Sequence, residues 1–335
     1  MSSTMDRPLC PTYSPEQLSR YFDKLNLPSK LRREVWDIAL LASKKGTSTY
    51  KTLVLSQLQA LQRYHLAALP FENLDLHYSF HRSISIAPTT VFEKIVGSTS
   101  RRGGYSLENN TLFGAVLQSL GCNIISVGGR VNEATQPTSG SKQRKASKYN
   151  GWSHMVNIVI IEGQKYLVDV GFGSNGPHKP IPLIQNYEFQ NTGNLHGRLI
   201  YGSVTQQGRT VQHPLWQYEI RAGDSSWVPA YCFTEMEFFP EDFTVMNYFM
   251  STNRASWFTF HVVCTRILLD NGGEKVVGDL TLFDNRIERT LGASSEVLET
   301  FVSEEERVAA LKKYFNISLS RADQESIRNT NSEIY

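Results

Sequence analysis

The sequence predicts an α+β protein in which helices and strands occupy different stretches of the chain. Apolar residues recur at helical spacing through the first 121 residues. Short segments rich in β-branched residues follow as far as residue 233, and beyond residue 238 the two patterns alternate. A chain of 335 residues is long for one compact core, so we expect two or three packed units.

The first part of the chain contains residues typical of the beginnings and ends of helices. Ser14 followed by Pro15 suits an N-cap and a first helical position. A second helical pattern begins near Leu53 and ends before Pro70, and Pro88 opens a third. The residues directly after Pro70 are expected to form a loop.

The clearest helix is predicted over residues 106–120. Its apolar stripe consists of Leu112, Phe113, Val116, Leu117 and Leu120. Gly121 suits the position just after the helix. Because Gly103 and Gly104 precede this segment, residue 106 is expected at a helix N-terminus that follows a sharp turn.

Strands are predicted from Asn123 onward. In the middle region they cover 123–131, 153–161, 165–170, 198–205, 209–220 and 226–233. In the last region strands at 256–269, 275–283 and 287–292 lie between helices at 242–250 and 304–315. The polar, basic stretch 132–149 is expected to be an exposed loop, and the tail after Arg321 is expected to fray.

Composition excludes several classes of function. Lys and Arg number 34 and Asp and Glu number 32, a balance that does not favour nucleic acid as a partner. The four cysteines show neither metal-ligand spacing nor the density of a disulfide scaffold, so no metal site is expected. The first residues lack an apolar run, and the longest one, 155–161, is too short to span a bilayer. We therefore expect a cytoplasmic protein that does not enter a membrane.

Three side chains could form a nucleophile–base–orienter set. If Glu162 and Gly163 make a two-residue hairpin loop, His154 and Asp169 lie on the same face as diagonal neighbours, about 7–8 Å apart at the backbone. His154 could then act as a base on Ser106, with Asp169 holding the imidazole. The N–H groups of the helix N-terminus would favour a developing anion.

Each of these residues also has a purely structural explanation. A single histidine in a strand is more often a packing residue, Asp169 before Gly171 could form a turn, and Ser106 could be a simple N-cap. Spacing alone leaves the function open.

Four segments together resemble the arylamine N-acetyltransferase family, in a fungal-like form. Arg102-Gly-Gly-Tyr-Ser-Leu-Glu-Asn-Asn110 resembles its active-site motif, with serine in place of cysteine. His65-Leu-Ala-Ala-Leu-Pro-Phe-Glu-Asn-Leu-Asp75 resembles a second signature. Gly151-Trp-Ser-His154 and Val168-Asp-Val-Gly-Phe-Gly173 resemble its histidine and aspartate segments.

The resemblance implies a fold of three parts with a triad arrangement like that of cysteine proteases. A helical domain (1–121) would bear the nucleophile position, a β-barrel domain (122–232) the histidine and aspartate, and an α/β lid (233–335) would follow. Ser106, His154 and Asp169 match the triad positions, and Gly151, Phe172 and Gly173 match positions that line the cleft for acyl-CoA and acceptor.

The chemistry implied by the resemblance is ping-pong transfer from acetyl-CoA or malonyl-CoA to an arylamine, arylhydroxylamine or hydrazine, with no tightly bound cofactor. We add the hypothesis that Lys142, Arg144, Lys145 and Lys148 reach the phosphates of CoA.

The serine at position 106 predicts weak or absent transfer. A thiol can be ionised in advance by a histidine, whereas a hydroxyl must lose its proton during attack and forms an oxyester, a poorer acyl donor. Ser106 could be engineered, a natural loss of catalysis, or part of an altered acyl chemistry. An amide synthase, a silent binder of CoA or arylamine, and a serine esterase are the alternative functions.

Overall fold

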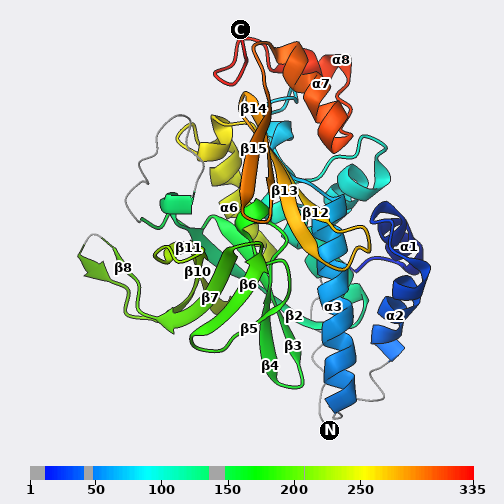
Figure 1. Cartoon of the computed structure of the whole chain (residues 1–335), viewed down its shortest axis with the longest axis vertical. Helices are drawn as coiled ribbons and strands as arrows, with labels where there is room; N and C mark the ends of the chain where they lie inside the picture. The colour runs from blue at the N-terminus through cyan, green and yellow to red at the C-terminus, as the bar shows by residue number, and fades with distance from the viewer. Residues whose placement is uncertain (1–11, 41–47, 136–147, 207) are drawn as a thin grey trace.

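Five of the described α-helices lie in the first 121 residues, and most strands of the antiparallel sheets follow, with three further helices in the last third of the chain (Figure 1). The computed structural model describes residues 12–40, 48–135, 148–206 and 208–335. The α-helices are α1 (Pro15–Lys24), α2 (Ser29–Leu40), α3 (Ser48–Ala68), α4 (Pro88–Phe92), α5 (Ser106–Ser119), α6 (Pro240–Thr252), α7 (Glu304–Phe315) and α8 (Arg321–Ser326). The predicted α+β class is confirmed, although α2 and α8 were not predicted.

The helices of the first part begin and end for local reasons. The Ser14 side chain accepts a hydrogen bond from the N–H of Gln17, whose own side chain accepts one from the N–H of Ser14, so α1 starts with a capping box. At the far end of α5, Gly121 adopts a φ of 80°, the left-handed conformation that suits the residue after a helix. Both predicted boundaries are confirmed.

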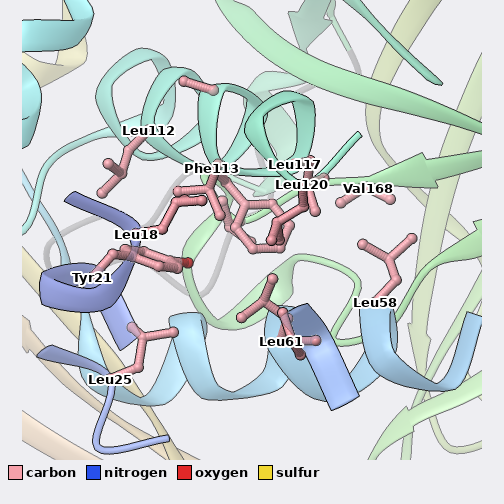
Figure 2. Close-up of a cluster of buried hydrophobic side chains, with 14 of the residues drawn as sticks. Leu18, Tyr21, Leu25, Leu58, Leu61, Leu112, Phe113, Leu117, Leu120 and Val168 are labelled. Carbon is pink, nitrogen blue, oxygen red and sulfur yellow. The ribbon is translucent and has the colours of Figure 1, made fainter. Parts of the chain in front are cut away.

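One hydrophobic core holds the helices against the middle sheet. Figure 2 shows Tyr21 of α1, Leu61 of α3 and Phe113 of α5 converging on one cluster, with Val168 reaching it from the sheet. All four side chains are fully or almost fully buried. The helix that begins at Ser106 is therefore fixed against the sheet that carries His154.

The middle sheet contains the strands β5-β4-β3-β2-β11-β10-β7-β6 in that order. Their bounds are β2 (Asn123–Val131), β3 (His154–Ile161), β4 (Gln164–Val168), β5 (Ile181–Pro182), β6 (Tyr187–Thr192), β7 (Leu195–Gly202), β10 (Leu215–Ala222) and β11 (Val228–Glu237). A separate small hairpin joins β8 (Thr205–Gln206) and β9 (Arg209–Thr210).

The order of these strands requires the sheet to curl into a barrel. β5 and β6 lie at opposite edges, yet only residues 183–186 connect them. Eight strands laid flat would separate the edges by about 34 Å, whereas five steps along the chain reach at most about 18 Å. The nearly closed, barrel-like sheet follows from this short connection.

The hairpin between β3 and β4 has the two-residue loop that the sequence predicts. Glu162 and Gly163 both have positive φ values, 50° and 76°, as a tight hairpin turn requires. Ile161 pairs with Gln164, and the register continues to Asn157 opposite Val168.

The last part of the chain forms a second sheet that takes in a piece of the first part. Its order is β1-β12-β13-β14-β15, with β1 (Phe71–Glu72), β12 (Val263–Leu269), β13 (Val276–Phe283), β14 (Arg286–Leu291) and β15 (Ser294–Thr300). Phe71 pairs with Thr265 and Glu72 with Cys264, so the loop predicted after Pro70 is in fact a short edge strand. None of the helices that the structure describes is long and apolar enough to cross a membrane.

The expectation of a frayed tail was wrong. After α8, Ile327 is fully buried in a core that includes residues of the second sheet and of α7, and the buried Arg307 donates a hydrogen bond of 2.7 Å to the Ser332 carbonyl. Ile334 packs against the same core, so two apolar residues dock a segment that is otherwise polar.

We expect Ile327→Ala to lower the free energy of unfolding by about 2–4 kcal/mol, because it empties a filled site in the core. Urea denaturation would measure this loss. The control, Ile184→Ala, removes a side chain that is 47% exposed and should cost less than about 1 kcal/mol. Equal losses for the two variants would contradict a docked tail.

Candidate active site

Ser106 is the first residue of α5, at the position the sequence predicts for a nucleophile. The turn before it requires glycine, because a Cβ atom on Gly103 would lie 1.8 Å from the Pro70 carbonyl oxygen. The Ser106 side chain is buried, and its Oγ makes no hydrogen bond to any residue that the structure describes. A buried hydroxyl without a partner at a helix N-terminus suits a group that acts on a bound molecule.

His154 and Asp169 meet as the hairpin register predicts. His154 begins β3, Asp169 follows the end of β4, and His154 Nε2 lies 2.7 Å from Asp169 Oδ2. Both side chains are almost completely buried. Since Asp169 engages Nε2, the second ring nitrogen, Nδ1, remains for proton transfer.

Asp169 is held as a carboxylate. Its Oδ1 accepts hydrogen bonds from Asn110 Nδ2 at 2.9 Å and from the Gly171 N–H at 2.8 Å. Burial acts to raise the pKa of Asp169, but the charge of His154 and these hydrogen bonds outweigh it, so the pKa lies below its ordinary value. An ionised Asp169 fixes the orientation of the imidazole.

Gly171 brings the two halves of the site together. A Cβ atom at this position would lie 2.5 Å from Asn110 Nδ2 and 2.6 Å from Ser106 Cα. Only glycine lets the segment after Asp169 rest directly on the first turn of α5.

A cavity of about 470 Å³ unites the predicted residues. Ser106, His154, Gly151, Phe172 and Gly173 all line it, while Asp169 lies behind His154. The Phe172 ring packs against His154 with centroids 5.2 Å apart. Among the residues that the structure describes, no group of three or more His, Cys, Asp or Glu side chains could hold a metal ion.

Sequence reasoning missed the wall of the cavity that comes from the last part of the chain. Trp257, Phe258, Phe260 and His261 line it, together with Phe249 of α6. The strand predicted over 256–269 begins only at Val263, since residues 257–259 form a short 3₁₀ turn. The cluster of aromatic residues at 257–261 was the available signal, because so many rings in one short segment seldom serve a strand alone.

A buried ionic cluster supports the turn before Ser106. Arg102 donates to Glu72 at 2.9 Å and to Asp75 at 2.6 Å, and Lys94 reaches Asp75 at 2.6 Å and Glu108 at 2.7 Å. Three carboxyl groups face two cations, and burial raises the pKa of Glu108 to about 7. Glu72 and Asp75, from the segment 65–75, therefore hold Arg102 and the active-site segment 102–110 in place.

We expect Arg102→Met to lower the free energy of unfolding by about 3–5 kcal/mol, because the buried Glu72 loses its hydrogen-bonded cation and Lys94 is left to face three carboxyl groups. Thermal and urea denaturation would measure the change. Arg101→Met is the matched control, since Arg101 is the exposed neighbour of Arg102 and its loss should cost less than about 0.5 kcal/mol. Similar losses for both variants would show that the cluster contributes little.

Asp75 makes the cluster sensitive to acid. Burial acts to raise its pKa, but Lys94 and Arg102 outweigh this and lower it to about 2. A depressed pKa means stability that is present above about pH 4 and lost as the pH falls towards 2, on the order of 2 kcal/mol. The difference in unfolding free energy between the native chain and Asp75→Asn should shrink over this interval, whereas a difference independent of pH would contradict it.

The basic loop proposed to reach CoA lies mostly outside the described residues. Lys142, Arg144 and Lys145 are not among them. Lys148 is described and pairs with Glu133 at 3.6 Å. The hypothesis therefore stays a prediction.

Comparison with known proteins agrees with this architecture. A family model described as N-acetyltransferase matches residues 54–324. The N-malonyltransferase FDB2 of Fusarium pseudograminearum is 38% identical over 326 residues, which cover 95% of this chain and 93% of the relative.

Solved structures share the fold over nearly the whole chain. The arylamine N-acetyltransferase from Mycobacterium abscessus has a TM-score of 0.72 at 23% identity and covers 93% of both chains. That of Mycobacterium marinum, in complex with CoA, has a TM-score of 0.68 at 23% identity and covers 93% of this chain and 97% of its own. With the extent of the family model and the identity to the fungal relative, these findings place the chain in the arylamine N-acetyltransferase family.

Proposed function

We propose that this site transfers an acyl group from acyl-CoA to the nitrogen of an aromatic amine, hydroxylamine or hydrazine through an acyl-enzyme. The observation that carries the proposal is one cavity that brings Ser106, at a helix N-terminus, together with the buried His154–Asp169 pair. We further propose malonyl-CoA as a donor, because a relative 38% identical over nearly the whole chain is named an N-malonyltransferase.

In the first half-reaction Ser106 Oγ attacks the thioester carbonyl and its proton passes to His154 Nδ1. The N–H groups at the start of α5 stabilise the negative charge on the carbonyl oxygen. When the C–S bond breaks, the proton moves from His154 to the sulfur of CoA, and an acyl oxyester remains on Ser106.

In the second half-reaction the amine attacks the oxyester and His154 accepts the amine proton. His154 then returns this proton to Ser106 Oγ as the C–O bond breaks, which releases the amide and restores the site. Asp169 stays ionised throughout and holds Nε2. We propose that both steps are slow in this chain: the first because serine must lose its proton during attack, and the second because an oxyester is a poorer acyl donor than a thioester.

Intact-mass measurement of the acyl-enzyme would test the proposal. The chain is incubated with malonyl-CoA without acceptor, in the native form and as Ser106→Cys and Ser106→Ala. We expect one malonyl adduct on Ser106→Cys that an arylamine removes, a slower adduct on the native chain, and none on Ser106→Ala. Binding of CoA without an adduct in any form would instead indicate a silent binding protein.

A further inference from the structure

A second histidine–aspartate pair borders the same cavity. His261 lines it, and its Nδ1 lies 2.7 Å from Asp284 Oδ2. Asp284 Oδ1 accepts the Val262 N–H at 3.0 Å, which fixes the carboxylate. The mechanism above makes no use of this pair.

The His261 ring is held in place from several sides. Its centroid lies 5.2 Å from that of Trp257 and 5.1 Å from that of Phe283. The backbone carbonyl oxygen of His261 accepts hydrogen bonds from Asn73 Nδ2 at 2.7 Å and from His77 Nε2 at 3.0 Å. The side chain remains 26% exposed, so a positioned imidazole is accessible from the cavity.

Few of the cavity-lining residues that the structure describes can carry a positive charge. Among these described residues, only His154 and His261 can do so. His154 is committed to Asp169, and the acidic lining residue Glu133 is paired with Lys148. If an acyl group with a free carboxylate enters this cavity, the carboxylate needs a hydrogen-bond donor there, because burying an unpaired charge is costly.

We infer that His261 binds the free carboxylate of a malonyl group and so selects malonyl-CoA over acetyl-CoA. An imidazole that carries both protons donates Nδ1–H to Asp284 and Nε2–H to the substrate carboxylate. Asp284 is the positioning residue of the pair. The inference rests on the proposed function for its donor, but it concerns binding and does not require turnover.

Isothermal titration of the native chain with malonyl-CoA and with acetyl-CoA would test it. We expect tighter binding of malonyl-CoA, and we expect His261→Gln to reduce the affinity ratio of the two donors by about 10- to 100-fold, the scale of a hydrogen bond between charged groups. Asp284→Asn should reduce the same ratio by a smaller factor. His213→Gln, at an exposed histidine, is the matched control and should leave the ratio unchanged.

An equal affinity of the native chain for the two donors, or a ratio that survives in a folded His261→Gln, would overturn the inference. Using the ratio cancels any general loss of CoA binding, and circular dichroism would verify folding. The proposed function fails on a different result, the absence of an acyl adduct on Ser106→Cys. The two failures are therefore distinguishable.

Discussion

Replacing Ser106 by cysteine is expected to raise the rate of N-acyl transfer by roughly 10³-fold, the scale on which a disabled triad member lowers kcat. Cysteine at this position gains a nearby imidazole and the N-terminus of α5, both of which favour the thiolate. It also forms a thioester, which an amine cleaves more readily than an oxyester. Steady-state assays with malonyl-CoA or acetyl-CoA and an anilide-forming acceptor would measure the gain.

Putting sulfur in place of the Ser106 oxygen is a change small enough to leave the structure intact. Ser106 is buried and its Oγ has no described partner, so the thiol replaces a group that stabilises little. Ser106→Ala serves as the control and should be inactive. If the native chain and Ser106→Cys were equally slow while both bound CoA, the site would lack a function in acyl transfer.

Asp169→Asn, introduced into Ser106→Cys, is expected to lower kcat by about 10³–10⁴-fold. An amide cannot hold Nε2 of His154 as a carboxylate does, and it can present its NH₂ group and favour the wrong tautomer. The loss should appear in kcat for both donors, because Asp169 lies behind His154 and does not line the cavity.

Asp224→Asn is the matched control, since Asp224 is exposed and lies in a turn of the barrel. Because Asp169 also receives hydrogen bonds from Asn110 and Gly171, the melting temperature of the variant needs to be measured with its activity. A folded Asp169→Asn with full activity would remove Asp169 from the mechanism.

The His154–Asp169 pair could be predicted because its geometry is local. A two-residue loop at Glu162-Gly163 sets the register, and the register decides which side chains share a face. The same locality explains why the boundaries of α5 and α7 agree with the sequence pattern, since capping residues and apolar spacing are properties of a short segment.

The side of the site that the last part of the chain forms could not be predicted in this way. Phe71 and Glu72 lie in a strand only because β12 offers them an edge, and periodicity carries no signal for a partner so distant in sequence. The wall at Trp257–His261 depends on hydrogen bonds from Asn73, a residue of the first part of the chain. Such contacts are determined by tertiary packing, which local propensity does not encode.

The pairing of β1 with β12 has a consequence for biosynthesis. Residues 71–72 leave the ribosome long before residues 264–265, and contacts between such distant segments form late in folding. The nascent chain therefore displays its nucleophile position before the wall that encloses it exists. The cavity that Ser106 shares with Trp257 and His261 can therefore exist only after both segments have been synthesised and packed together.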